Sequence, residues 1–94
     1  MNEQMREEHF ERITDEKLGM VDRAEQYLMD RGFRQVRVRV HGNMARIELL
    51  PEDMDRFMAE GVRAQAYAFI KGLGFDYVAL DLGGYRTGSM NVGV

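Results

Sequence analysis

Arginines are the residues of this chain whose types and spacing best suit binding chemistry, and three of them fall in one alternating stretch. Residues 36–49 read V-R-V-R-V-H-G-N-M-A-R-I-E-L. Strict alternation of apolar and polar residues is the period of a strand with one buried face. Gly42-Asn43 is a hairpin turn signal because both residues tolerate a positive φ. The stretch therefore predicts a β-hairpin with its tip at residues 42–43.

The hairpin sorts its side chains onto two faces. With the tip at residues 42–43, Arg39 lies opposite Arg46. Arg37 lies opposite Glu48. A shift of one residue would pair valine with arginine throughout, so the hydrophobic pattern and the turn agree on one register. One face is then apolar, and the other carries Arg37, Arg39, His41, Arg46 and Glu48.

The crowded arginines of the polar face need negative charge nearby, because like charges opposite each other destabilise a sheet. Two interpretations stay open. The face is solvated and holds a single Arg37–Glu48 pair, or a bound anion or acidic neighbour offsets the arginines. Arginine's planar fork suits phosphate and carboxylate. The candidate phosphate-binding residues are Arg37, Arg39, Arg46 and His41.

Three carboxylates are candidate cation ligands, provided that the fold brings them together: Glu25, Glu48 and Asp81. Carboxylate oxygens suit a hard divalent cation such as magnesium or calcium, and the sequence indicates no other cofactor. The absence of cysteine excludes disulfides, thiolate metal sites and a cysteine nucleophile in this chain. His41 is the one acid–base candidate of the hairpin, and no nucleophile or second base is paired with it.

The last stretch, G-G-Y-R-T-G-S-M-N at residues 83–91, differs from the rest. Glycine-rich loops with hydroxyl groups can wrap an anion with backbone N–H groups. Arg86 and Ser89 are therefore candidates for an anion-binding loop. No helix follows, so the stretch is neither a P-loop nor a dinucleotide fingerprint. Its composition also fits a flexible tail, which remains the alternative.

A first helix should precede the hairpin. Thr14 is a good N-cap residue, and two acids follow it in the first turn. The helix should end at Arg31-Gly32, where glycine suits the position after the last turn. Its apolar stripe is predicted at Leu18, Val21, Ala24 and Leu28.

A second helical region and a third strand should follow the hairpin, whose first strand is expected to open at Phe33. Pro51 suits the first turn of a helix. Gly61 weakens a helix interior, so a bend or break is expected between Met58 and Val62. The helix should then run to Gly74. Residues 75–82 predict the third strand, with Val78, Leu80 and Leu82 on one face.

These elements predict an α+β fold: a single small α-β-β-α-β domain with a β-hairpin, a three-stranded sheet and both helices packed on its apolar face. The crossover between the second and third strands should be right-handed if both belong to one sheet. Residues 1–12 are expected to form a flexible arm, residues 13–91 the domain and residues 92–94 a tail. The sequence leaves the strand order open.

Composition limits the classes of partner. A chain of 94 residues predicts one domain. A domain this small buries only about 60–65 % of its unfolded surface, so self-association would help it, and a homo-oligomer is expected. The net charge of -3 argues against a nucleic-acid partner.

No apolar run approaches the length of a membrane span, and no signal peptide is evident. We therefore expect no membrane partner and a cytoplasmic location.

Three motifs resemble a known family. They are L-x-x-V-x-x-A-E-x-Y-L, R-G-F-R-Q-V-R-V-R-V-H-G-N-M-A-R-I-E and L-G-F-D-Y-V-A-L-D-L-G-G-Y-R-T-G-S-M-N. Over residues 13–91 they resemble the C-terminal part of the ATP-dependent sacrificial sulfur transferases. Those enzymes act in making the nickel-pincer nucleotide cofactor of lactate racemase and belong to the PP-loop ATP pyrophosphatase superfamily.

The resemblance implies roles for particular residues. In the family, the two arginines of the R-V-R run are associated with the phosphate of a pyridinium biscarboxylate mononucleotide, and here they are Arg37 and Arg39. Acidic residues of this region are associated with metal binding, which points to Glu25 and Glu48. A further family aspartate would fall near Asp53 or Asp55, where the two sequences align loosely.

The departures from the family limit what this chain does alone. The S-G-G-x-D-S phosphate loop of the nucleotide-binding domain is absent, and so is the cysteine that gives up its sulfur. The chemistry needs that thiol. We therefore expect a non-catalytic module that binds an anionic mononucleotide-type ligand, a separate PP-loop protein, or both. The alternative is an assembly module without a ligand, which self-associates through the polar sheet face or the glycine-rich tail. A third hypothesis, an independent enzyme that uses the His-Glu-Arg face, stays open.

Overall fold

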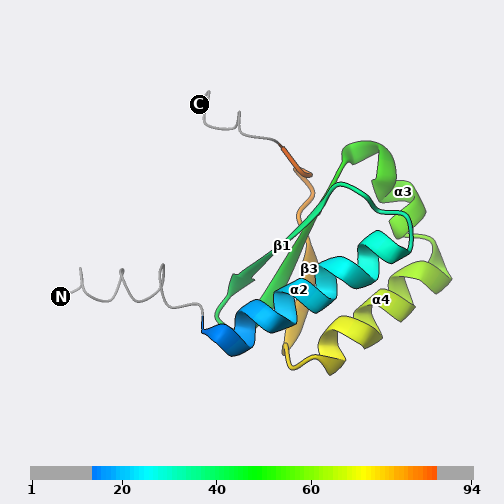
Figure 1. Cartoon of the computed structure of the whole chain (residues 1–94). Helices are drawn as coiled ribbons and strands as arrows, with labels where there is room; N and C mark the ends of the chain where they lie inside the picture. The colour runs from blue at the N-terminus through cyan, green and yellow to red at the C-terminus, as the bar shows by residue number, and fades with distance from the viewer. Residues whose placement is uncertain (1–13, 87–94) are drawn as a thin grey trace.

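A computed structural model describes residues 14–86 (Figure 1). The predicted arm of residues 1–12, the predicted tail of residues 92–94 and Ser89 of the predicted anion loop lie outside these residues. The elements follow the order α2 (Asp15–Asp30), β1 (Val36–His41), β2 (Met44–Leu49), the short 3-10 helix η1 (Pro51–Asp53), α3 (Met54–Phe57), α4 (Glu60–Gly72) and β3 (Tyr77–Leu80). The predicted α+β class and the α-β-β-α-β order are confirmed.

Helix α2 begins and ends as its sequence predicts. The Thr14 hydroxyl accepts a hydrogen bond from the Lys17 backbone N–H at 3.1 Å, and Gly32 follows the helix with a φ of 96°. The predicted stripe was partly wrong, because Leu18 is 48 % exposed. Met20 is buried in its place, together with Ala24 and Leu28. These three residues are spaced by four, so they form one row along the helix.

The helical region between β2 and β3 is interrupted at the expected position. Helix α3 ends at Phe57 and α4 begins at Glu60, with an extended residue, Ala59, between them at ψ 141°. The third strand is shorter than predicted. A turn follows β3, closed by the Gly84 N–H and the Asp81 carbonyl at 3.1 Å. Leu82 lies in that turn and is 85 % exposed, so its predicted place on the apolar strand face was wrong.

Strand β2 is the central strand of the sheet. The strand order is β1-β2-β3, with β1 and β2 antiparallel. The predicted hairpin register is confirmed in full, from His41 opposite Met44 to Val36 opposite Leu49. β3 runs parallel to β2, with Ala45 opposite Val78. The first strand was predicted to open at Phe33 but opens at Val36, because the Phe33 ring is buried in the core and packs edge-on against Phe57 with centroids 5.6 Å apart.

The helices α2 and α4 cover one face of the sheet (Figure 1). The core lies between these layers and contains Met20, Ala24, Leu28, Phe33, Val38, Ala45, Ile47, Leu49, Phe57, Ala66, Ile70 and Phe75. The opposite face of the sheet carries the polar residues of the hairpin. No helix within residues 14–86 is long and apolar enough to span a membrane.

Substituting Ile70→Ala should destabilise the domain by about 2–5 kcal/mol, because it leaves a cavity in the layer between α4 and the sheet. Ile70 is fully buried, whereas the next residue, Lys71, is exposed on the same helix. Lys71→Ala is therefore the matched control and should change the free energy of unfolding by less than about 0.5 kcal/mol. Urea unfolding followed by circular dichroism measures both, and equal effects would contradict the assigned core.

Candidate functional site

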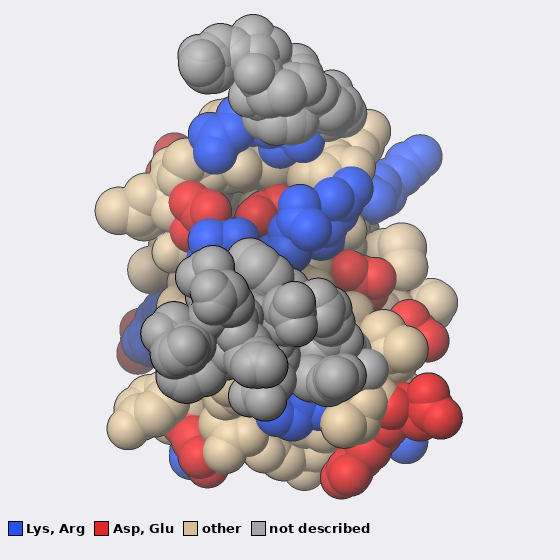
Figure 2. Space-filling model, turned by 90° about the vertical axis from the view of Figure 1, so that its left-hand side faces the viewer, with Lys and Arg blue, Asp and Glu red and all other residues tan. Residues whose placement is uncertain are grey.

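The face of the sheet opposite α2 and α4 carries charged side chains, and Figure 2 shows side chains of both signs next to one another. The hairpin alternation puts Arg37 and Arg39 of β1 on this face, together with Arg46 and Glu48 of β2. Asp81 adds a carboxylate just after β3. We refer to these five residues as the arginine face. It is the place where the fold concentrates groups that can bind an anion.

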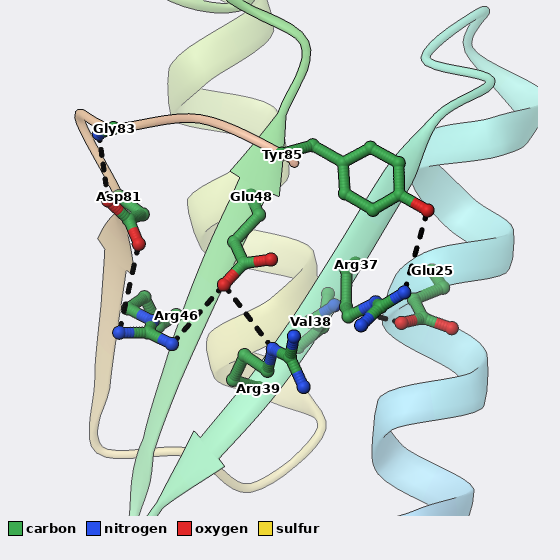
Figure 3. Close-up of polar contacts among 9 residues, drawn as sticks. All are labelled: Glu25, Arg37, Val38, Arg39, Arg46, Glu48, Asp81, Gly83 and Tyr85. Carbon is green, nitrogen blue, oxygen red and sulfur yellow. Dashed lines mark hydrogen bonds and ion pairs between the residues drawn. The ribbon is translucent and has the colours of Figure 1, made fainter. Parts of the chain in front are cut away.

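Glu48 lies between the two arginines that face each other. Its Oε2 accepts from the Arg39 Nε at 3.3 Å and from the Arg46 Nη2 at 3.2 Å (Figure 3). Glu48 is only 7 % exposed although it is charged. A buried carboxylate is tolerated when it is paired and hydrogen-bonded, and here two guanidinium groups share one oxygen. An acidic neighbour therefore offsets the arginine crowding.

Arg46 also contacts a second carboxylate. Its Nη1 lies 3.7 Å from the Asp81 Oδ2. The other Asp81 oxygen accepts from the Gly83 N–H at 2.8 Å, which orients the carboxylate. Arg46 Nε is buried and has no hydrogen-bond partner among the described residues. Arg46 is thus held in position by its terminal nitrogens, Nη1 and Nη2.

Arg37 has a different environment. The Arg37–Glu48 pair, which belonged to the solvated-face interpretation, does not form, because Arg37 turns toward Tyr85 although it lies opposite Glu48 in the register (Figure 3). The Arg37 Nη2 donates to the Tyr85 hydroxyl at 3.5 Å, and its guanidinium carbon lies 5.2 Å from the ring centroid. Within residues 14–86, no carboxylate lies within ion-pair distance of Arg37.

Tyr85 is a site residue that the sequence reasoning missed. Its backbone N–H donates to the Leu49 carbonyl at 2.7 Å, which fastens the chain after β3 to the end of β2. The approach needs glycine at position 84. Gly84 has a φ of 83°, and a Cβ there would lie 3.0 Å from the Leu49 oxygen. The G-G-Y sequence after the last strand was the available signal, and it was interpreted as a loop or tail without a role for the tyrosine.

Two further predicted anion-binding residues, His41 and Arg86, form no hydrogen bond or ion pair with these arginines among the described residues. His41 is exposed next to the hairpin tip, which Lys17 braces by donating to the Gly42 carbonyl at 2.7 Å. Arg86 is exposed and donates to the Gly83 carbonyl at 3.3 Å. The structure therefore places Arg37, Arg39 and Arg46 on one face, and it does not pair His41 or Arg86 with any of them.

The predicted metal ligands do not converge. The Glu25 Oε2 accepts from the Val38 backbone N–H at 2.8 Å, so this carboxylate covers the outer edge of β1. Glu48 lies across β1 from it and points toward the arginines (Figure 3). Among residues 14–86, no three histidine, aspartate or glutamate side chains form a group able to hold a metal ion. A cation held by Glu25 or Glu48 with donors from elsewhere stays a prediction.

The geometry defines a class of site. Three guanidinium groups, held by a shared carboxylate and by a tyrosine, lie on the open face of a small α+β domain. Guanidinium groups fixed in this way donate to phosphate or carboxylate oxygens in a bidentate manner. The arrangement therefore has donors suited to an anionic group among the described residues.

Comparisons with known proteins identify the relatives of this chain. No protein-family model matches it. An uncharacterised protein of Synechocystis sp. is 47 % identical over 81 residues, which cover 86 % of this chain and 30 % of that protein. Pyridinium-3,5-bisthiocarboxylic acid mononucleotide synthase of Lactiplantibacillus plantarum is 43 % identical over 79 residues, which cover 84 % of this chain and 28 % of that enzyme.

The resemblance noted in the sequence is thereby confirmed. The chain is homologous to one part of the sacrificial sulfur transferases of lactate racemase cofactor biosynthesis. It spans less than a third of the length of either relative.

Replacing Glu48 by glutamine should destabilise the domain by about 1–3 kcal/mol at low salt, because Arg39 and Arg46 then face each other without a counter-charge. Added sodium chloride should restore part of the loss, since salt screens repulsion between partly exposed charges. Glu52 is exposed in η1, and Glu52→Gln is the control. Thermal unfolding at several salt concentrations measures the effect, and a salt-independent loss would contradict the charge argument.

Proposed function

We propose that this chain is a binding module that holds the phosphate or carboxylate group of an anionic mononucleotide-type ligand on Arg37, Arg39 and Arg46. A PP-loop domain, contributed by another protein or by further sequence of a longer chain, would supply ATP chemistry. The sulfur would come from a cysteine outside these 94 residues, because they contain none. The module's own task is to bind and orient the ligand.

One observation carries this proposal: the positive charge of the arginine face exceeds its negative charge. The face holds three guanidinium groups and two carboxylates, Glu48 and Asp81. Both carboxylates are used by Arg39 and Arg46, so Arg37 keeps its charge without an acidic partner among the described residues. A ligand oxyanion near Arg37 would balance the excess, and an unmatched guanidinium at a preorganised position favours such a ligand.

The class of ligand comes from the relatives. The Lactiplantibacillus plantarum enzyme is named for a pyridinium-derived acid mononucleotide, which carries phosphate and acid groups. Arg37 and Arg39 form the R-V-R run of the motif that resembles the family. We therefore take a mononucleotide as the ligand class and phosphate as the group that Arg37 and Arg39 bind.

Preorganisation adds to the support. Free arginine side chains lose rotamer freedom when they bind an anion, and that loss weakens binding. Here Glu48 fixes Arg39 and Arg46, and Tyr85 contacts Arg37, before any ligand arrives. The three arginines lie on strands β1 and β2, which keeps the spacing of their guanidinium groups constant.

Titration with inorganic phosphate and then with a nucleoside monophosphate tests the proposal. We expect saturable shifts of the Arg37 and Arg39 side-chain Nε–Hε signals in two-dimensional NMR. Arg37→Ala should weaken binding about 10–100-fold, the range for losing a charged hydrogen bond of about 1.5–3 kcal/mol. Arg34 is exposed and precedes β1, so Arg34→Ala is the matched control with the same loss of charge. Equal effects of the two variants would reduce the interaction to general electrostatics and contradict the site.

Tyr85→Phe should separate the hydroxyl contact from the ring contact. The variant keeps the aromatic face near Arg37 and removes the hydrogen bond to its Nη2. We expect phosphate affinity to fall by about 2–10-fold, in line with about 0.5–1.5 kcal/mol for a hydrogen bond, with an unchanged unfolding midpoint. Tyr27→Phe on α2 is the control, because Tyr27 stacks on Phe69 away from the arginine face. Unchanged affinity in Tyr85→Phe would remove Tyr85 from the site.

A further inference from the structure

The two edges of the sheet differ in whether a side chain covers their outward-directed backbone groups. At the β1 edge, the Glu25 carboxylate covers the outward backbone N–H of Val38 at 2.8 Å. At the other edge, β3 pairs only with β2 within the described residues. The Tyr77 and Asp81 N–H groups point to β2 and donate to the Asn43 and Ile47 carbonyls. Strand alternation then directs the peptide groups of residues 78 and 80 outward.

A groove lies beside the open β3 edge. It has a volume of about 210 Å³ and is lined mainly by apolar side chains, among them Ile47, Phe57, Met58, Tyr67, Val78 and Leu80. Two of the lining residues are large and exposed, Met58 at 49 % and Tyr67 at 46 %. Single exposed apolar residues are ordinary. An apolar groove next to unpaired strand edge groups is the combination that accepts another strand.

We propose that the β3 edge is a dimer interface at which a second copy of this chain pairs its β3 antiparallel to the first. Such pairing continues the sheet across a two-fold axis from three strands to six. The interface is isologous, so the same edge and groove serve both copies. It leaves the arginine face open, and it differs from the polar face and the tail that the sequence suggested for self-association.

The chain is self-complementary in one register. With Ala79 opposite the partner's Ala79 at the axis, Val78 lies opposite the partner's Leu80. In this register, residues 78 and 80 of one strand can form backbone hydrogen bonds with residues 80 and 78 of the other. A shift by two residues in either direction would place one of them opposite a residue outside β3. Their side chains, which line the groove, meet on the helix-covered side of the sheet.

The charges that flank β3 are compatible with a second copy as the occupant. Asp76 and Asp81 flank β3. In the register centred on Ala79, Asp81 lies opposite the partner's Tyr77, and Asp76 lies opposite the partner's Leu82, so no two carboxylates face each other. A shift by one residue would put Asp76 directly opposite the partner's Asp81, and opposed like charges destabilise a sheet. Dimerisation would also enlarge the buried area of a domain whose size keeps its stability small.

Analytical ultracentrifugation over a concentration series tests the interface with two variants of one position. In the single chain, residue 79 lies on the polar face opposite Arg46, so Ala79→Glu should fold. In the dimer, the two glutamates would oppose each other across the axis. We expect the wild type and Ala79→Gln to dimerise, and Ala79→Glu to raise the dimer dissociation constant at least tenfold at low salt. Circular dichroism confirms the fold of each variant.

Cross-linking tests the register independently. The chain contains no cysteine, so Ala79→Cys introduces a single thiol. Residue 79 directs its peptide groups to β2, and it would therefore form a non-hydrogen-bonded pair across the axis. Such pairs have a Cα separation of about 4.5 Å, which is within the range of a disulfide. Mild oxidation should give a covalent dimer of Ala79→Cys, and Asp22→Cys, exposed on α2, should remain largely monomeric.

Three results would overturn the proposal. The first is a wild-type chain that stays monomeric at every concentration. The second is a dimer that Ala79→Glu leaves intact, since it would then use another surface. The third is oxidation that links Asp22→Cys as readily as Ala79→Cys. None of these results bears on phosphate binding by the arginine face, so the two proposals fail separately.

Discussion

The contact of Glu48 with Arg39 and Arg46 is the interaction on which the arginine face depends. The hairpin register forces the two arginines to lie opposite each other, and the same register that buries the valine face prevents any shift that would separate them. One oxygen of the nearly buried Glu48 carboxylate forms ion pairs with both guanidinium groups. The close approach of the two arginines and the spacing of their guanidinium groups therefore depend on Glu48.

The same contacts explain why the two carboxylates of the face leave one arginine without a counter-charge. Glu48 and Asp81 are both used by the two facing arginines, and Arg37 is left to Tyr85. Tyr85 reaches Arg37 only because the chain after β3 turns at Gly84 and is fastened to Leu49. An aromatic hydroxyl orients a guanidinium group without cancelling its charge. The face thus keeps an ordered guanidinium group without an acidic partner among residues 14–86.

The sequence alone was enough for much of the fold. Alternation with a Gly-Asn turn determined the hairpin and its register, and Thr14 and Gly32 marked the ends of α2. Both signals are local, because strand period and helix capping depend on neighbours in the chain. Motif similarity indicated the family, and the comparisons confirmed it. The residues of the arginine face that lie on β1 and β2 were also found from the sequence, because alternation alone assigns them to the sheet face opposite the apolar one.

Tertiary structure decided which groups those arginines contact and which side chain covers the β1 edge of the sheet. Glu48 was predicted to pair with Arg37, but the fold gives it Arg39 and Arg46 and gives Arg37 the ring of Tyr85, a residue 48 positions away. Glu25 turned out to cover the β1 edge, and Met20 replaced Leu18 in the core. These contacts depend on how α2, β1 and the loop after β3 pack together. Sequence patterns specify the face on which a side chain lies, whereas only packing specifies which distant group it meets there.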